Sequence, residues 1–248
     1  NKIRDLTDSI GTVHSDFAAM SRIANDYFHK IFSADTSLDA SAVTGLFEQV
    51  VSPADNARLC APFTDEEISD AMFQIGPLKA PGPDGFPARF FQRNWGVVKD
   101  SVVAVVRDFF STRCMPEGVN ATSIVLIPKI SNPTKMSDYR PITLCNVTYK
   151  VISKCLVNRM RPLLDDIISV EQSAFIPGRM ITDNALVAFE CLHYIKEEKD
   201  PTKSFCAYKL DLSKAYDRVD WGFLEQVMKR LGFSQRWIDW VMACVTSV

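Results

Sequence analysis

The chain has 248 residues, of which 47% are hydrophobic and 23% charged, and its formal net charge is −2. This composition is typical of a globular protein that buries a sizeable core, in one large domain or two small ones. The near neutrality argues at first against a nucleic-acid partner, but the charge is unevenly placed. Residues 121–164 hold seven Lys or Arg and one acid, a net charge of +6, which leaves −8 for the rest of the chain.

The cysteines and the apolar runs argue against a secreted or membrane protein. Seven cysteines are scattered along the chain without a C-x-x-C pair. We therefore expect buried thiols, an intracellular reducing compartment and no disulfide-linked partner. No run of about eighteen apolar residues occurs, so we expect no membrane partner.

Helical patterns dominate the first part of the chain. Residues 16–32, DFAAMSRIANDYFHKIF, place apolar side chains at helical spacing. Thr64 and Glu67 form a capping box for a second helix, which the pair Gly76-Pro77 would end. The segment LKAPGPDGFPARFF, residues 78–91, is too rich in proline and glycine for regular structure. It is either a plain linker or a shaped loop.

The rest of the chain mixes helices with short strands. TSIVLIPK (122–129) and DYRPITL (138–144) predict two extended segments around a turn. Another strand is expected over 205–212. The predicted helices are residues 99–113, 144–164, 182–199 and 222–231, the last ended by Gly232, and a final helix capped by Ser234. The tryptophans Trp95, Trp221, Trp237 and Trp240 are expected to anchor the core. These patterns favour an α+β fold that is helix-rich at the front.

Asp211 stands at the end of an apolar strand pattern, where a carboxylate needs water, a partner or a metal ion. One alternative is that Asp211 or Ser213 caps the following turn. The run of Asp211, Asp217 and Asp220 holds more acid than one cap requires. A hard cation such as magnesium, shared with substrate phosphates, fits this run better.

Four ordered motifs carry a family resemblance. YKLDLSKAYDRVDW (208–221) resembles the first carboxylate motif of the reverse transcriptase palm, in the form found in non-LTR (LINE-type) retrotransposons, especially those of plants. The resemblance extends through residues 78–95, 123–160 and 171–186. It implies a right-hand polymerase fold with fingers and an incomplete palm sheet. The implied organisation is a helical N-terminal extension (1–63), a fingers-like region (64–204) and the start of a palm (205–248).

The resemblance also implies roles at the site of nucleotide transfer. Asp211 would bind both Mg²⁺ ions as the catalytic carboxylate, and the backbone carbonyl of Leu212 would be a further metal ligand. Tyr216 would pack beneath the sugar of the incoming dNTP and exclude a ribose 2′-hydroxyl. Lys129 and Arg140 would close over the triphosphate, whose leaving group needs positive charge.

A second set of residues would face the template. Lys150, Lys154 and Arg161, with Arg159 as a further candidate, recur at helical spacing as a basic stripe, although such stripes are often only solvated faces. In the loop after this helix, the resemblance brings Gln172, Phe175, Gly178 and Arg179 toward the template. A position for Phe175 in the core is the alternative.

The expected function is that of a fragment of an RNA-directed DNA polymerase, with RNA template, DNA primer and dNTP as partners. The aromatic-x-Asp-Asp motif that would complete the metal site does not follow Asp211, and the sequence ends inside an apolar helical pattern. We therefore expect no polymerisation by this chain alone. The alternative is a non-catalytic nucleic-acid-binding remnant of such an element. The resemblance points to the nucleus as the place of action.

Overall fold

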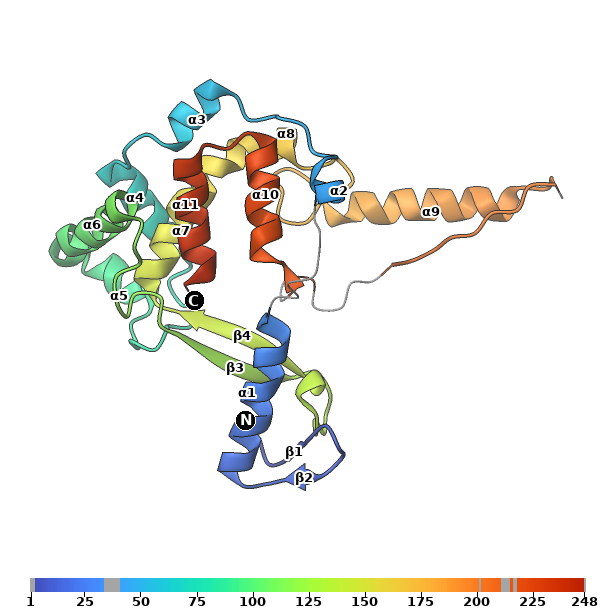
Figure 1. Cartoon of the computed structure of the whole chain (residues 1–248), viewed down its shortest axis with the longest axis horizontal. Helices are drawn as coiled ribbons and strands as arrows, with labels where there is room; N and C mark the ends of the chain where they lie inside the picture. Colours follow the sequence, from blue (N-terminus) through green and yellow to red (C-terminus); the bar gives the residue numbers. More distant parts are fainter. Residues whose placement is uncertain (1–2, 34–40, 201, 211–214, 216–217, 248) are drawn as a thin grey trace.

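The computed structural model describes residues 3–33, 41–200, 202–210, 215 and 218–247. The fold consists of a helical body, a β-hairpin beside it and one long helix, α9, that projects away from both (Figure 1). It is a helix-rich α+β arrangement, as the sequence predicts. Within the described ranges no helix is both long and apolar enough to cross a bilayer.

The elements in chain order are β1 (Leu6–Thr7), β2 (Val13–His14), α1 (Phe17–Phe32), α2 (Ser41–Thr44), α3 (Pro53–Leu59), α4 (Asp65–Phe73), α5 (Ala88–Arg93), α6 (Trp95–Thr112), β3 (Thr122–Pro128), the 3₁₀ turn η1 (Met136–Asp138), β4 (Tyr139–Cys145), α7 (Val147–Met160), the 3₁₀ turn η2 (Arg161–Leu163), α8 (Leu164–Ile167), α9 (Ile181–Glu197), α10 (Trp221–Leu231) and α11 (Gln235–Thr246).

The main core joins helices that are far apart in the sequence. It is built from α3, α4, α6, α7, α10 and α11. Fully buried side chains from five of these helices are Leu59, Ile68, Phe109, Ile152 and Trp237. Burying such side chains stabilises the fold by roughly 1.5–3 kcal/mol each. The three predicted regions, 1–63, 64–204 and 205–248, therefore all contribute helices to one core. The boundaries between these regions stay a prediction.

Side-chain caps begin four helices of the body, and a glycine ends one of them. Ser52 and Thr64 each form a complete capping box, at α3 and α4. The Asp220 and Ser234 side chains accept hydrogen bonds from the first turns of α10 and α11. Gly232 ends α10 with φ at 91°, a left-handed conformation that glycine adopts without strain.

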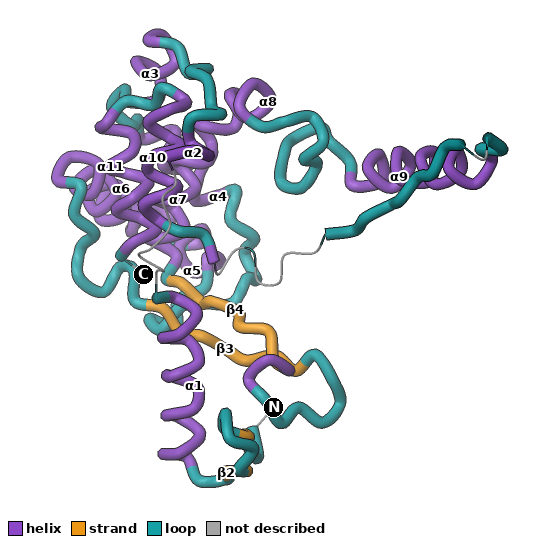
Figure 2. The backbone as a smooth tube through the Cα atoms, turned by 45° about the vertical axis from the view of Figure 1, so that its right-hand side comes forward, coloured by secondary structure: helices purple, strands orange, loops and turns teal. Residues whose placement is uncertain are grey.

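The strands β3 and β4 form an antiparallel hairpin whose two faces have different surroundings. Leu126 and Tyr139 lie on the face that packs against α1 and the N-terminal residues. Figure 2 shows α1 running beside the two strands. The opposite face, with Val125 and Ile142, is exposed. The short β1–β2 pair next to this contact was not predicted, because two-residue strands leave no periodic pattern.

The strand expected over residues 205–212 is wrong for the described part of that segment. Residues 205–210 have no regular secondary structure, and Tyr208 is 81% exposed. A strand requires a hydrogen-bonded neighbour, and no other described segment pairs with this one. The alternating apolar pattern of residues 205–210 is therefore not sufficient to form a strand. Residues 211 and 212 lie outside the described residues.

Two predictions about buried side chains also need correction. Trp237 and Trp240 are core anchors, but Trp221 is 41% exposed because it is the first residue of α10, outside the packed middle of the helix. All seven cysteines are free, and only Cys155 and Cys244 are buried. The exposed cysteines lie in loops and on α9. Burial raises the pKa of both buried thiols to about 12, so neither thiol is a nucleophile at neutral pH.

Candidate nucleotide and template interface

The two cations assigned to the triphosphate, Lys129 and Arg140, lie on one face of the hairpin. Arg140 pairs with Ile127 across the ladder. The Lys129 amide donates to the Asp138 carbonyl at 2.8 Å, which continues the same register. Cross-strand partners share a face, as do residues two apart, so both exposed side chains project to the same side. Lys129 Nζ also donates to the Ser137 carbonyl at 2.8 Å, which holds it near the tip.

This open face combines positive charge with apolar surface. Val125 and Ile127 are exposed beside the two cations. Asp138 shares the face, but its Oδ2 accepts from the amides of Lys135 at 2.9 Å and Thr134 at 3.1 Å. These bonds hold the pKa of Asp138 below its usual range and direct its charge toward the hairpin tip. The face suits a ligand with phosphate groups and an apolar part.

Asn146 ties the base of the hairpin to two loops. It is buried where β4 leads into α7. Its Oδ1 accepts from the Asp84 amide at 3.2 Å, and its Nδ2 donates to the Gly118 carbonyl at 2.9 Å. Lys150 Nζ donates to the Ala80 carbonyl at 3.0 Å. The segment LKAPGPDGFPARFF is therefore a shaped loop that runs into α5 and not a plain linker.

Gly82 is the position at which this loop contacts Asn146 most closely. A Cβ at Gly82 would lie 2.2 Å from Oδ1 and 2.4 Å from the backbone N of Asn146. We expect Gly82→Ala to lower the free energy of unfolding by about 2–3 kcal/mol, because the backbone of the corner must move. Gly96→Ala is the matched control, since open space surrounds Gly96 in α6 and the change there is at most about 1 kcal/mol. Equal urea midpoints for the two variants would contradict the close contact.

The basic stripe predicted on α7 is partly formed. Lys150, Lys154 and Arg161 lie at the surface or partly exposed, and Val151 and Ile152 are buried beneath them. Lys150 also anchors the loop at Ala80, and Arg161 lines a cavity of about 290 Å³ together with acids of α4. A template-binding role for this stripe stays a prediction.

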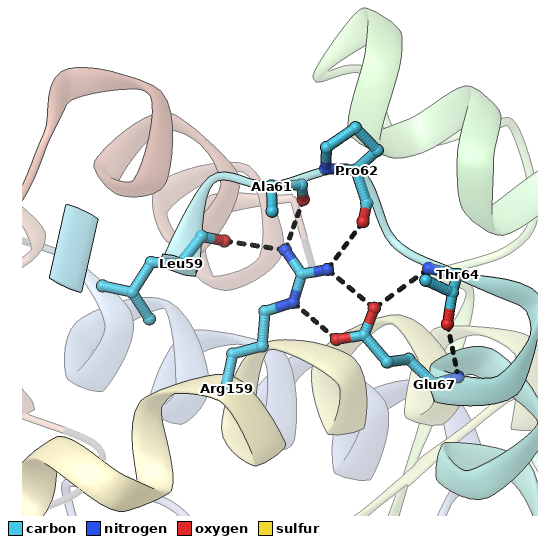
Figure 3. A network of polar contacts seen from close by, with 6 residues as sticks. All are labelled: Leu59, Ala61, Pro62, Thr64, Glu67 and Arg159. Atoms are coloured by element: carbon cyan, nitrogen blue, oxygen red, sulfur yellow. Dashed lines mark hydrogen bonds and ion pairs between the residues drawn. The ribbon is translucent and has the colours of Figure 1, made fainter. Parts of the chain in front are cut away.

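Arg159, the further candidate for the stripe, is instead a structural clamp (Figure 3). Its Nε donates to Glu67 Oε1 at 2.7 Å and its Nη2 to Glu67 Oε2 at 2.8 Å. Nη1 donates to the carbonyls of Leu59, at 2.9 Å, and Ala61. Nη2 also donates to the Pro62 carbonyl at 2.9 Å. The guanidinium thus uses five donors to join α7 to the connection between α3 and α4.

The surroundings of Arg159 exclude it from a nucleic-acid surface. Its side chain is only 8% exposed, and its guanidinium carbon lies 3.4 Å from the centroid of the Phe63 ring. Glu67 is the capping-box residue of α4 and also accepts from the Thr64 amide at 2.9 Å. The hydrogen bonds from Arg159 hold the pKa of Glu67 below its usual range.

In the loop between α8 and α9, Arg179 organises the backbone. Its Nη1 donates to the carbonyls of Ser169 at 2.6 Å and Gln172 at 2.9 Å. Its Nη2 donates to the Ile168 carbonyl at 3.1 Å and to Asp165 Oδ1 at 3.0 Å. The side-chain role expected for Gln172 at a template stays a prediction, as does that of Arg179.

Phe175 and Gly178 give this loop its unusual backbone. Phe175 is 82% exposed with φ at 65°, so the alternative that placed it in the core is wrong. A positive φ is costly for a bulky residue and requires support from the surrounding loop. Gly178 has φ at 80° and open space around it, so a ligand can approach its backbone closely. Template contacts at both residues stay a prediction.

Three residues carry the contacts assigned to metal and sugar binding. Asp211, Leu212 and Tyr216 lie outside the described residues, as does Asp217. No group of three or more potential metal ligands occurs in the part of the chain that the structure describes. Asp220 caps α10 by accepting from the Phe223 amide at 2.7 Å. Carboxylate and carbonyl oxygens are hard donors that suit Mg²⁺, so the chemistry of the proposed donor set is compatible with that ion.

Comparison with known sequences bears on the same region. Residues 127–247, which include the hairpin tip, β4, α7 and the segment around Asp211, match a family model described as reverse transcriptase (RNA-dependent DNA polymerase). This chain is a relative of non-LTR reverse transcriptases. The resemblance predicted from its motifs is thereby confirmed. The plant-like part of it stays a prediction, because the relatives described next come from animals.

Three relatives of this chain are proteins of transposable elements. The "Transposon TX1 uncharacterized 149 kDa protein" of Xenopus laevis is 28% identical over 96% of the chain and 18% of that protein. The Pol polyprotein from type-1 retrotransposable element R1 of Bradysia coprophila is 25% identical, over 63% of the chain and 15% of that protein. The Pol polyprotein from element R2 of Popillia japonica is 24% identical, over 70% of the chain and 23% of that protein. The chain thus spans less than a quarter of the length of these relatives.

Sequence reasoning missed the residues that support this interface. Asn146 directly precedes an apolar helical pattern, which is a recognised helix-start signal, but its side chain bonds to loops instead of the helix. Gly82 lies between two prolines, which indicates a turn and not the side chain that the turn contacts. Arg159 could not be separated from the exposed lysines by spacing alone.

Proposed function

We propose that this chain supplies the nucleotide- and template-facing part of an RNA-directed DNA polymerase of a non-LTR retrotransposon. Residues 64–204 would be its fingers-like region and residues 205–248 the start of its palm. The observation that supports this most directly is the common open face of Lys129 and Arg140, within the segment that matches reverse transcriptases. The proposed partners are an RNA template, a DNA primer and dNTP, and the proposed place of action is the nucleus.

The hairpin would bind and orient the triphosphate of the incoming nucleotide. Arg140 presents a planar guanidinium suited to bidentate contact with phosphate oxygens, and Lys129 adds a point charge near the tip. Positive charge placed there stabilises the negative charge that accumulates on the departing pyrophosphate. The apolar surface of Val125 and Ile127 lies beside the cations and would contact the less polar parts of the ligand.

The segment after residue 204 would provide the reacting centre. Asp211 and the Leu212 carbonyl would hold Mg²⁺, which would supply charge neutralisation at the attacking and leaving oxygens when bound. Tyr216 would place its ring against the sugar, so that a 2′-hydroxyl is excluded and DNA is made. Lys154 and Arg161 would contact template phosphates, and Phe175 would offer a ring for base stacking.

A two-ligand binding experiment on the 248-residue chain tests the assignment of the cations. The ligands are a fluorescent dNTP and a fluorescent RNA–DNA primer–template. We expect Lys129→Ala and Arg140→Ala each to weaken dNTP binding about tenfold, since each removes a charge-assisted contact. Lys154→Ala should leave dNTP binding unchanged. For primer–template binding, it should reduce the slope of log affinity against log salt concentration by about one, the value for one lost phosphate contact.

Lys229→Ala is the matched control for these variants. Lys229 is an exposed lysine on α10 that pairs with Glu225, away from both proposed contacts. It should change neither affinity. The assignment is contradicted if Lys229→Ala weakens dNTP binding as much as Lys129→Ala, or if neither hairpin variant has an effect.

A further inference from the structure

The N-terminal segment, residues 3–33, packs on the tip of the β3–β4 hairpin. Leu6 is 1% exposed and forms a second, separate core with Met136 and Tyr139 from the hairpin. Figures 1 and 2 show α1 beside the strands. Partly buried side chains surround this second core, and they are Ile3, Met20, Ile23, Ala24, Tyr27, Phe28 and Leu126. The contact therefore joins elements more than a hundred residues apart in the sequence.

A backbone hydrogen bond connects the same two regions. The Thr7 amide donates to the Thr134 carbonyl at 2.7 Å. Thr134 lies at the start of the hairpin tip, where its amide donates a hydrogen bond to Asp138 Oδ2. The N-terminal segment thus fixes both the side chains and the backbone of the hairpin tip.

The fixed tip is also the part of the hairpin that holds Lys129. Lys129 bonds to the carbonyl of Ser137 through Nζ and to the carbonyl of Asp138 through its amide, both at 2.8 Å. Met136 and Tyr139, the two residues buried against Leu6, flank these carbonyls directly in the sequence. Tyr139 lies on the face opposite to Arg140, since neighbouring strand residues alternate. The N-terminal segment therefore covers one face and leaves the cationic face open.

A hairpin of two strands is only marginally stable by itself. In the described part of the chain β3 and β4 pair with no third strand. The second core is the contact that stabilises the tip, because Met136 and Tyr139 would be exposed without Leu6 and α1. We propose that residues 3–33 are a brace for the hairpin tip, and that Leu6 is a positioning residue for Lys129. The consequence for phosphate binding rests on the proposed function; the brace itself does not.

Two substitutions within the brace and one control test this proposal by amide hydrogen exchange. Leu6→Ala and Met20→Ala shorten side chains in the second core from two different elements. Phe17→Ala makes a comparable change on α1 at an exposed position outside that core. We expect the amides of Lys129 and Asp138 to exchange about tenfold faster in the two brace variants and at the wild-type rate in Phe17→Ala. Amides of α6 and α7 should keep their protection, which shows that the main core is folded.

The second readout is the affinity of the same variants for inorganic tripolyphosphate. Leu6→Ala and Met20→Ala should bind it about fivefold more weakly than the wild type, because the binding geometry is then populated less often. Unchanged exchange at Lys129 and Asp138 would overturn the brace. Faster exchange with unchanged affinity would overturn the positioning role of Leu6. A wild-type chain that does not bind tripolyphosphate would contradict the proposed function instead, and the exchange data would still decide whether the brace exists.

Discussion

Arg159→Ala is expected to lower the free energy of unfolding by about 2–4 kcal/mol, because a buried guanidinium with five hydrogen bonds is lost, although its partner Glu67 is 38% exposed. The substitution leaves Glu67 without its bidentate partner and removes the donors to the carbonyls of Leu59, Ala61 and Pro62. It also removes the contact of the guanidinium with the Phe63 ring. The connection between α3 and α4 would then keep its apolar packing against α7, in the core that contains Phe63 and Leu156.

Urea unfolding of the wild type, Arg159→Ala and Arg58→Ala measures this effect. Arg58 is the matched control, because it makes an exposed ion pair with Asp55 and its removal should cost at most about 1 kcal/mol. The pKa of Glu67 is lowered in the folded state, so its contribution is present above the ordinary glutamate pKa and is lost as the pH falls through the folded value. The difference between the wild type and Arg159→Ala should therefore shrink in acid. Equal losses for the two arginine variants at neutral pH would contradict the clamp.

Local signals explain which parts of the fold were predictable. The capping boxes at Ser52 and Thr64, and the glycine at position 232, act through neighbouring backbone atoms, so the sequence contains all the relevant information. The antiparallel hairpin was also predicted, because two β-branched runs flank a turn with Asn132 and Pro133. In each case the interacting segments are neighbours along the chain.

The errors arise where a distant partner decides the outcome. The pattern over residues 205–210 predicts a strand, but strand formation depends on a neighbour that no other described segment supplies. Arg159 has the spacing of the exposed lysines, and only the fold brings Glu67 and three carbonyls to it. Leu6 is a single apolar residue between Asp5 and Thr7, and its partner, Tyr139, is far along the chain. Tertiary contacts of this kind leave no periodic trace.

The largest expected effect on activity concerns Asp211. In a polypeptide that continues this chain through the aromatic-x-Asp-Asp motif implied by the resemblance, we expect Asp211→Asn to reduce primer extension about a thousandfold or more. The substitution keeps the size of the side chain but removes the charge proposed to hold Mg²⁺. Asp220→Asn is the matched control, because asparagine caps a helix about as well as aspartate and α10 should remain intact.

Primer extension on an RNA template with these two variants is the most direct test of the central claim, that this chain is the nucleotide-binding part of a reverse transcriptase. The account predicts Mg²⁺-dependent DNA synthesis by the wild type and Asp220→Asn, and none above background by Asp211→Asn. Extension by Asp211→Asn at the wild-type rate, or no extension by a folded wild-type polypeptide that binds the primer–template, would contradict it. The second of these results would favour a remnant that binds nucleic acid without copying it.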